Sequence, residues 1–310
     1  MIRVLCLNPV IDRMYYINNF TAGSKFFEIK PHVYIGGKGI NIARVMSIMG
    51  EPCELYGFIG GHSGEEVRQE MKQYGVPFKA IELKGDTRTT INIIDKFNQW
   101  ETEITEPGTA VSRKEQQRFM QNLAQDLLPG DMVICSGIPM KGMDENIYQQ
   151  ISKLCESRQC DCVLDATGVY LKSSLPGKYF FTKPNVNELS ELFSITEFSS
   201  EEDIVNYGKR LLDMGIDHLL ISTGEEGGIF LNRNVIFKTI IPKTKVVSTI
   251  GSGDSAVAGF CLGVRRGMRL EDCVRLAMAC GINNAGFSKV GYVERAAVET
   301  LYERIELSYI

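Results

Sequence analysis

The 310-residue sequence contains only three histidines and lacks the motifs of several large enzyme classes. No Gly-Lys pair is followed by Ser or Thr, which excludes a Walker A phosphate loop. No Gly-x-Gly-x-x-Gly follows a strand-like run, so a dinucleotide-binding fingerprint is unsupported, and the absence of His-Glu-x-x-His excludes zinc-protease chemistry. A phosphate or metal site in this chain must therefore use other residues.

Long apolar runs and clustered charge are absent as well. No uninterrupted apolar segment is long enough to span a bilayer, and nothing in the first residues resembles a signal peptide. The formal net charge is -4 with scattered basic residues, so neither a membrane nor nucleic acid is an expected partner. Nine cysteines at irregular spacing, without histidine nearby, indicate reduced thiols, and we expect a cytoplasmic protein.

Strand-like apolar runs alternate with amphipathic helical runs through most of the chain. Residues 53–58, 132–135 and 218–221 are such strands, and residues 119–127 and 147–154 carry apolar side chains at helical spacing between them. This order predicts an α/β fold, a doubly wound and mostly parallel sheet with helices on both faces.

Two segments interrupt the alternation, residues 11–34 and 88–105. The first is rich in Tyr, Phe and Ile, and the second has strand-turn-strand character with a turn near Asn98. Neither has a helical partner, so we expect them to form one small antiparallel β-sheet that acts as a lid. The predicted α/β core is then residues 1–10, 35–87 and 106–310.

Residues 248–255, Ser-Thr-Ile-Gly-Ser-Gly-Asp-Ser, are the most informative stretch that is present. They precede the apolar run 256–263, which is typical of a buried helix. Free N–H groups and the positive end of the helix dipole at such a start attract anions. A carboxylate at the same place, Asp254, indicates chemistry beside a bound phosphate.

Residues 36–41, Gly-Gly-Lys-Gly-Ile-Asn, form a second glycine-rich entry into a helix, with a cation and an amide. A plain glycine turn is the alternative. Asp12 and Arg88 lie where the two segments of the proposed lid leave the core. Each is either a ligand of a sugar phosphate or an ordinary turn or surface residue.

Two further loops follow predicted strands. In residues 183–188, Lys-Pro-Asn-Val-Asn-Glu, Asn185 and Glu188 suit water-mediated Mg²⁺ contacts, or cap a helix, or both. Residues 222–228, Ser-Thr-Gly-Glu-Glu-Gly-Gly, either contact a nucleotide or turn a hairpin. If the loops of Asp12, residues 36–41, Arg88, residues 183–188 and residues 222–228 had only structural roles, each would need its own separate explanation. Five such coincidences together are improbable.

Together these motifs resemble the ribokinase-like (PfkB-type) carbohydrate kinases. Residues 248–261 are similar to the family's C-terminal signature, residues 36–41 to its Gly-Gly-Lys-Gly-x-Asn motif, and residues 183–188 to its Asn-x-x-Glu motif. The resemblance covers essentially the whole chain in the same order. Residues 7–12 and 87–89 resemble the branch that phosphorylates hexose monophosphates.

The resemblance implies a role for each matching residue. Asp254 would be the catalytic base, with the amides of Gly251, Ser252 and Gly253 stabilising the transferring phosphoryl group. The implied substrate residues are Asp12, Gly37, Lys38, Asn41, Arg88 and Ser136, with Lys38 and Arg88 on the substrate phosphate and Asp12 and Asn41 on sugar hydroxyls. The implied ATP residues are Lys183, Ser222, Gly224, Gly227 and Asn283, and Asn185 and Glu188 would organise Mg²⁺.

The resemblance also defines the expected reaction, ATP-dependent phosphorylation of a hexose monophosphate to a bisphosphate. Fructose 1-phosphate, giving fructose 1,6-bisphosphate, is the favoured substrate, and tagatose 6-phosphate or another sugar is the alternative. A catalytically silent sensor of sugar phosphate or nucleotide is the hypothesis from another class. We expect a homodimer paired through the lid. Ser248 stands where many relatives have an Asp that helps to bind a monovalent cation, so we do not expect strong potassium activation.

Overall fold

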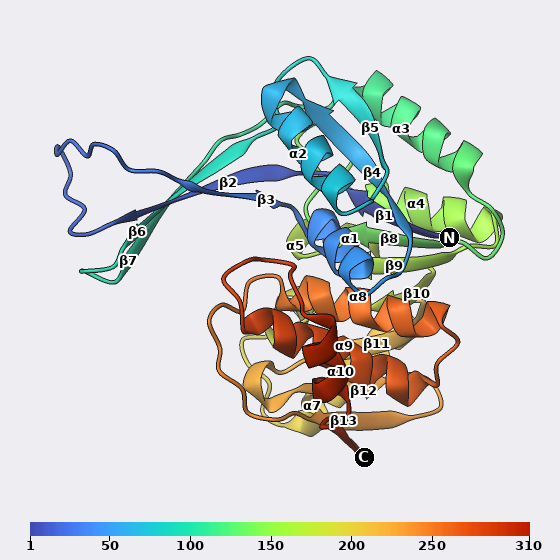
Figure 1. Cartoon of the computed structure of the whole chain (residues 1–310). Helices are drawn as coiled ribbons and strands as arrows, with labels where there is room; N and C mark the ends of the chain where they lie inside the picture. The colour runs from blue at the N-terminus through green and yellow to red at the C-terminus, as the bar shows by residue number, and fades with distance from the viewer.

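Ten strands form one large sheet through the molecule (Figure 1), in a computed structural model that describes residues 1–310. Across the sheet the order is β14 (Glu306–Tyr309), β13 (Ile236–Ile240), β12 (Gly228–Leu231), β11 (Ile216–Ser222), β10 (Tyr179–Thr182), β9 (Asp161–Asp165), β8 (Met132–Ser136), β1 (Ile2–Cys6), β4 (Cys53–Gly60) and β5 (Phe78–Leu83). The strands from β11 to β5 pair in parallel, whereas β12, β13 and β14 add an antiparallel edge. The predicted mostly parallel sheet is confirmed.

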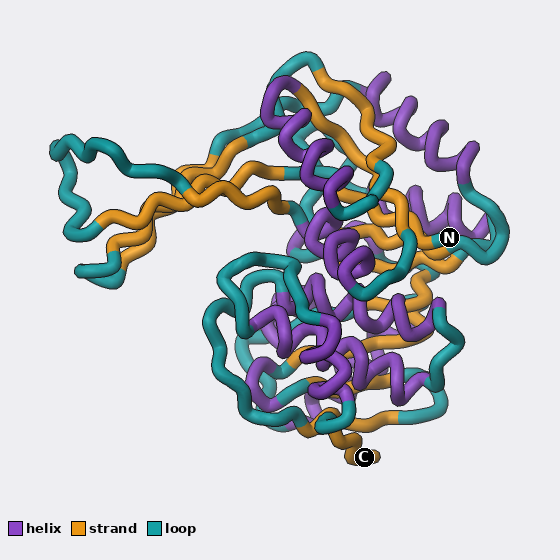
Figure 2. Tube along the Cα trace, viewed as in Figure 1, coloured by secondary structure: helices purple, strands orange, loops and turns teal.

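Helices cover both faces of this sheet, as the sequence predicts (Figure 2). One apolar core is formed with α1 (Lys38–Ile48), α2 (Gly61–Gln73), α8 (Ser252–Arg265), α9 (Leu270–Ala285) and α10 (Arg295–Tyr302). The other is formed with α3 (Arg113–Asp126), α4 (Ile147–Ser157), α5 (Gly168–Ser174), α6 (Val186–Phe193) and α7 (Glu201–Asp213). With both faces covered, central strands such as β1 and β8 are buried at every position. None of the helices is long and apolar enough to cross a membrane.

The path of the chain determines where a ligand can bind. From β1 the chain builds β4 and β5 on one side, then returns to place β8, β9, β10 and β11 on the other side of β1. The direction of winding therefore changes between β1 and β8. In open α/β sheets, ligands bind beyond the carboxyl ends of the strands at such a switch point.

The second sheet contains four strands and projects sideways from the body of the molecule (Figure 1). Its order is β3 (His32–Gly36), β2 (Val10–Ile17), β6 (Thr89–Asp95) and β7 (Trp100–Thr105). Two antiparallel pairs, β2 with β3 and β6 with β7, meet at a parallel central pair, β2 with β6. The predicted small sheet from two separate segments is confirmed. Its centre is parallel because β2 and β6 both leave the large sheet in the same direction.

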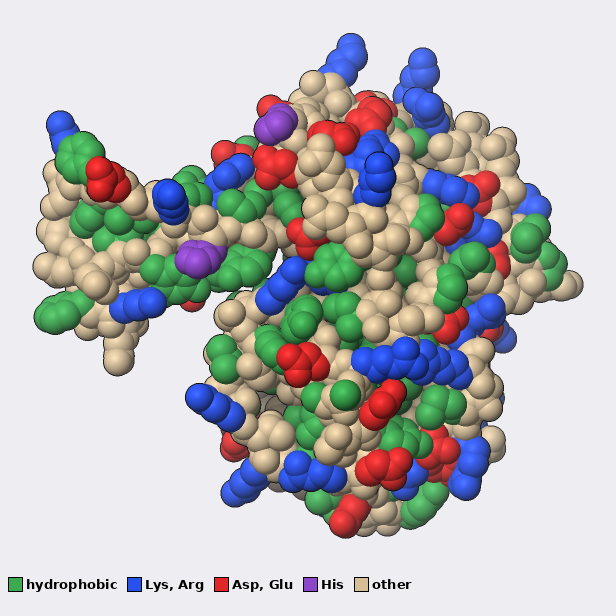
Figure 3. Space-filling view, viewed as in Figure 1, with side chains coloured by type: hydrophobic (Ala, Val, Ile, Leu, Met, Phe, Trp, Pro, Cys, Tyr) green, Lys and Arg blue, Asp and Glu red, His purple; other side chains and the backbone are tan.

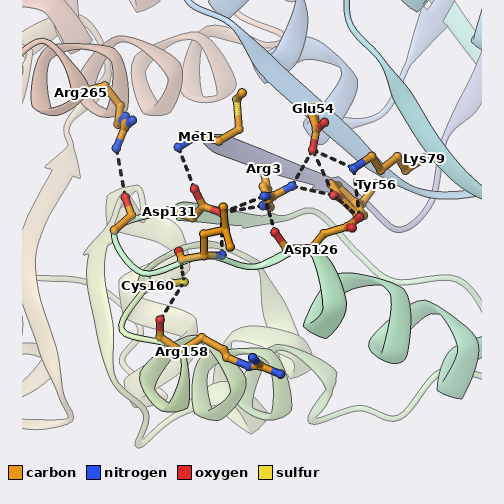
Figure 4. A network of polar contacts seen from close by, with 12 residues as sticks. Met1, Arg3, Glu54, Tyr56, Lys79, Asp126, Asp131, Arg158, Cys160 and Arg265 are labelled. Atoms are coloured by element: carbon orange, nitrogen blue, oxygen red, sulfur yellow. Dashed lines mark hydrogen bonds and ion pairs between the residues drawn. The ribbon is translucent and has the colours of Figure 1, made fainter.

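The edge of the large sheet at which its parallel strands begin carries a network of charges on β1, β4, β5 and the residue before β8 (Figure 4). Arg3, almost fully buried, donates to Asp131 at 2.9 Å and to the Tyr56 hydroxyl at 2.7 Å, and pairs with Glu54. Lys79 adds a second cation 3.2 Å from Glu54. Buried charges are tolerated only when they are paired, and each one here has a partner. This edge is therefore held rigidly, away from the carboxyl ends of the strands.

Candidate active site

The start of α8 presents free backbone N–H groups beside a carboxylate. Gly251 caps the helix with φ 81°, a left-handed conformation that favours glycine, and Asp254 lies in the first turn. The amides of Gly251 and Gly253 have no acceptor within the protein, whereas the Ser252 amide donates to the carbonyl of Thr249 at 3.1 Å. Two of the three predicted amides are therefore free to bind an anion at this helix start, and anion binding there stays a prediction.

Asp254 is buried and is held by two residues of the second glycine-rich entry. The Asn41 side-chain amide donates to Asp254 Oδ2 at 2.8 Å, and Lys38 Nζ lies 3.3 Å from Oδ1. Burial raises the pKa of Asp254, and the positive charge of Lys38 opposes that shift. The structure thus brings Asp254 together with Lys38 and Asn41, although Asp254 lies more than two hundred residues after them in the sequence.

Asp165 is a member of this cluster that the sequence analysis missed. It ends β9, is buried, and accepts a hydrogen bond from Lys38 Nζ at 3.0 Å. Burial disfavours the charged Lys38, but Asp165 and Asp254 outweigh burial and raise the pKa of Lys38. The available signal was its position as a polar residue at the carboxyl end of a parallel strand, the place where the other predicted residues follow their strands.

Lys183 supplies a second cation, and it has no partner. Its side chain follows β10, is buried, and makes no hydrogen bond or ion pair within the protein. Nζ lies 3.1 Å from the place that a Cβ on Gly253 would occupy. Burial lowers the pKa of Lys183, and Asp165 opposes that effect. A buried lysine without a partner beside a helix start is suited to binding an anion such as a phosphate.

Asn185 and Glu188 form a capping box at the start of α6. Asn185 Oδ1 accepts from the Glu188 amide at 2.8 Å, and Glu188 Oε2 accepts from the Asn185 amide at 2.9 Å. The capping alternative is therefore correct, and it leaves Glu188 Oε1 without a partner. Burial raises the pKa of Glu188, while the Asn185 amide and Lys38 oppose the shift.

The oxygen donors near α6 fit Mg²⁺ only if water and phosphate supply most of its ligands. No three His, Cys, Asp or Glu side chains lie close enough together to hold a metal ion by themselves. Mg²⁺ in phosphoryl-transfer sites usually keeps several waters and takes one or two carboxylates plus phosphate oxygens. Glu188 suits that arrangement, with the remaining positions left to water and nucleotide.

The loop after β11 lies next to the Lys183 segment. The Ser222 amide donates to the carbonyl of Pro184 at 3.0 Å, and the chain then turns into β12 through Gly224 and Gly227. The hairpin alternative is thus correct, and contact with a nucleotide stays a prediction for this loop. Asn283, on α9, accepts from the Glu294 amide at 2.7 Å, so its side-chain oxygen already supports the fold.

The proposed substrate side lies at the root of the second sheet. Burial raises the pKa of Asp12 to about 6, and the positive charge of Arg88 opposes that shift. Arg88 Nε donates to Asn8 Oδ1 at 3.0 Å, and its two terminal nitrogens have no acceptor. A guanidinium anchored by one nitrogen with its fork free is suited to a phosphate.

Gly37 and Ser136 complete the predicted set. Gly37 caps α1 with φ 114°, next to Gly39, where a Cβ would collide with the carbonyl of Leu5. These glycines let α1 begin against the end of β1. The Ser136 hydroxyl is buried and donates to the Leu5 carbonyl at 2.9 Å, and Ser136 pairs with Asp165 across β8 and β9; contact with substrate stays a prediction for this residue.

One cleft of the molecule lies apart from the charged cluster. It measures about 590 Å³ and lies between α7, β12 and β13, with Glu201, Thr223 and Lys238 among its lining residues. Thr223, Glu225, Glu226 and Gly228 of the loop 222–228 also line it, whereas no residue of the charged cluster does. The chemistry described above rests on the cluster of Asp254, Lys38, Asp165 and Lys183, where charge, burial and free amides converge.

The chain belongs to the pfkB family of carbohydrate kinases, whose pattern matches residues 6–285. It is 32% identical to the 1-phosphofructokinase of Bacillus subtilis (strain 168) over 294 residues, covering 95% of both chains. It is 33% identical to the 1-phosphofructokinase of Borreliella burgdorferi over 286 residues, covering 92% of both.

Solved structures show the same fold. A Staphylococcus aureus protein assigned as a phosphofructokinase superposes with a TM-score of 0.88 at 29% identity, over 100% of this chain and 99% of that one. Phosphofructokinase-2 from Escherichia coli, solved in complex with potassium, superposes with a TM-score of 0.89 at 22% identity, over 98% of each chain. The α/β architecture with its second sheet is therefore shared.

Proposed function

We propose that this chain transfers the γ-phosphoryl group of ATP to fructose 1-phosphate and so makes fructose 1,6-bisphosphate. The observation that carries the proposal is the buried Asp254 at the free start of α8, fixed by Asn41 and Lys38. An unpaired buried cation, Lys183, lies beside the same helix start. Similarity to 1-phosphofructokinases over more than nine-tenths of the chain supports this choice of acceptor.

The proposed step is an in-line displacement. The C6 hydroxyl oxygen of the sugar attacks the γ-phosphorus while its proton passes to Asp254, and the bond from the γ-phosphorus to the bridging oxygen of ADP breaks. The free amides of Gly251 and Gly253 stabilise charge on the transferring group. The products are the bisphosphate and ADP, and the proton on Asp254 returns to solvent.

The remaining residues hold the two substrates. Lys183 binds ATP phosphates, next to the loop of Ser222. Asn185 and Glu188 would hold Mg²⁺ through its waters, and the bound ion would offset the negative charge of the phosphates. We assign the existing substrate phosphate first to Arg88, because Lys38 already has two carboxylate partners and Arg88 has a free fork.

Asp254→Asn tests the proposed base. The change keeps shape and removes the proton acceptor, so kcat should fall by about 10² to 10⁴. The KM for ATP should change little. The readout is ADP release at saturating ATP and fructose 1-phosphate. The control is Asp217→Asn, which changes an exposed residue near the start of β11, at the end of the strand away from Ser222. Turnover close to the unaltered enzyme would rule out Asp254 as base.

A substrate panel separates the alternatives. Fructose 1-phosphate, tagatose 6-phosphate, fructose 6-phosphate and free fructose are compared by kcat/KM. We expect the highest value for fructose 1-phosphate, and a higher value for tagatose 6-phosphate would transfer the proposal to that sugar. If the protein releases no ADP with any of these sugars, the hypothesis of a catalytically silent sensor replaces the proposed kinase activity.

We also infer a role for the second sheet, residues 11–34 and 88–105, as a lid over the sugar and as the surface that pairs two chains. Asp12 and Arg88 at its root support the first role. Every residue of β7 is exposed, and an exposed edge strand is a ready template for pairing.

All nine cysteines are free thiols, which supports a cytoplasmic location.

A further inference from the structure

Arg44, in the middle of α1, is the most completely bonded buried cation of the molecule outside the proposed reaction groups. It is 1% exposed. Its guanidinium donates to Asn41 Oδ1 at 3.1 Å, to the carbonyl of Val290 at 2.8 Å and to the carbonyl of Ile35 at 2.6 Å. Glu70 on α2 accepts two further bonds, at 2.7 and 3.1 Å. Burying this charge is tolerated only because all five donors are satisfied.

The bond to Asn41 determines which way that side chain faces. An amide has one oxygen that accepts and one nitrogen that donates. Because Arg44 can only donate, it takes the oxygen, and the nitrogen is left facing Asp254 Oδ2 at 2.8 Å. The reversed amide would place its oxygen against a carboxylate and its nitrogen against a guanidinium, and both contacts are unfavourable.

The two carbonyl bonds tie Arg44 to the segments on either side of the cluster. Ile35 belongs to β3, the strand that leads from the second sheet into α1. Val290 lies in the loop after α9, and its side chain reaches within 2.6 Å of the place for a Cβ on Gly251. Tyr74 also contacts both the loop and Arg44. Lys289 Nζ in the loop donates to the Tyr74 hydroxyl at 2.8 Å, and the Arg44 guanidinium lies 5.6 Å from the centre of the Tyr74 ring.

We propose that Arg44 is a positioning residue for phosphoryl transfer, which fixes the Asn41 amide toward Asp254 and couples the root of the second sheet to the start of α8. Arg44 does not touch the reacting atoms. This role rests on the proposed function of Asp254 and extends it. It also explains why a long, charged side chain occupies a position on α1 where an aliphatic residue would be expected to fill the core.

Arg44→Met removes the donors and keeps much of the volume. We expect kcat per folded molecule to fall by about 10- to 100-fold, because small displacements of reacting groups are costly. The KM for fructose 1-phosphate should rise several-fold, since Asn41 is assigned to the sugar, and the KM for ATP should stay within about twofold. Simple loss of folded enzyme would lower apparent kcat and leave both KM values unchanged.

Glu70→Gln is the matched control. Gln keeps an oxygen that accepts from Arg44 and removes only the outer charge, so this variant should lower Tm and leave both KM values and kcat in place. If Arg44→Met does not fold, Arg44→Lys replaces it, because lysine keeps the charge and cannot reach Asn41, Ile35 and Val290 together. A Glu70→Gln enzyme with the same kinetic losses as the Arg44 variant would overturn the positioning role.

A double-mutant cycle identifies the route. In an Asn41→Ala background, Arg44→Met should change kcat by less than about twofold, because its effect passes through the missing amide. Fully additive losses would contradict that route. Asp254→Asn distinguishes failure of the positioning role from failure of the proposed function. If the Asp254 variant is inactive and the losses from Arg44→Met and Asn41→Ala are additive, only the positioning role is refuted. If the Asp254 variant is active, the proposed base is refuted.

Discussion

Asp12 combines burial with a neighbouring cation, and this gives the substrate side a pH dependence. Burial raises its pKa to about 6 and Arg88 opposes the shift, so the carboxylate takes up a proton between about pH 7 and 5. The ionised form accepts hydrogen bonds from sugar hydroxyls more strongly than the neutral acid does. The KM for fructose 1-phosphate should therefore rise as pH falls through this range.

Asp12→Asn separates this effect from protonation of the substrate's own phosphate. The variant should have a KM raised roughly tenfold at pH 7, the value expected for loss of a charge-assisted hydrogen bond. Its KM should depend less on pH than that of the unaltered enzyme, because only the substrate still titrates. KM curves of the same shape for both enzymes would show that Asp12 does not bind the sugar in its ionised form.

Individual residues show where sequence reasoning succeeds and where it stops. Asp254, Lys38 and Asn41 could be identified because each lies in a glycine-rich helix entry with a recognisable chemical purpose. Asp165 and Arg44 lie inside an ordinary strand end and an ordinary helix. Their importance comes largely from partners in other elements, Lys38 for Asp165 and Glu70 and Val290 for Arg44, and the local sequence around each residue does not show those partners.

At the scale of elements, Asp95 joins the two hairpins of the second sheet. Its carboxylate ends β6 and accepts from the amides of Asn19, Phe20, Phe97 and Asn98, and from the Asn98 side chain. Burial opposes ionisation, but the hydrogen bonds from Asn98, Phe20 and Asn19 outweigh it and hold the pKa of Asp95 below its ordinary value. The contribution is therefore present above about pH 4 and is lost only in stronger acid.

Asp95→Asn should loosen the outer end of the second sheet and leave the large sheet unchanged. An amide has one accepting oxygen where the carboxylate has two, so several of the five donors lose their partner. Hydrogen exchange at Phe20 and Asn98 should accelerate about tenfold or more. Glu103→Gln on the exposed β7 is the control and should leave these amides protected. Equal acceleration in both variants, or none in either, would contradict the role of Asp95.

The order of elements was predictable from periodicity, and the pairing inside the second sheet was not. Apolar strands alternating with amphipathic helices indicate a parallel sheet regardless of details, because both faces must be covered. Whether β2 meets β6 in parallel depends on the directions in which two distant segments leave the core. In the same way, the sequence does not show that the Ser136 hydroxyl bonds the carbonyl of Leu5 on the neighbouring strand.

At the scale of the whole molecule, we expect the projecting second sheet to pair with a second copy of the chain. On β7, Trp100 and Ile104 share one face and are 62% and 54% exposed, and Phe97 in the adjoining turn is 74% exposed. Figure 3 shows hydrophobic side chains along this projecting arm. Exposed apolar groups on an unpaired edge strand favour association.

Replacing Trp100 and Ile104 together by Glu should convert a dimer into a monomer at micromolar concentration. The added charges would be buried without partners in any interface built on this face. Leu128→Glu, an equally exposed leucine on the body of the molecule at 63%, is the matched control and should leave the mass unchanged. Sedimentation equilibrium measures the mass of each. A monomeric unaltered protein, or a double variant that keeps twice the mass of one chain, would exclude pairing through the second sheet.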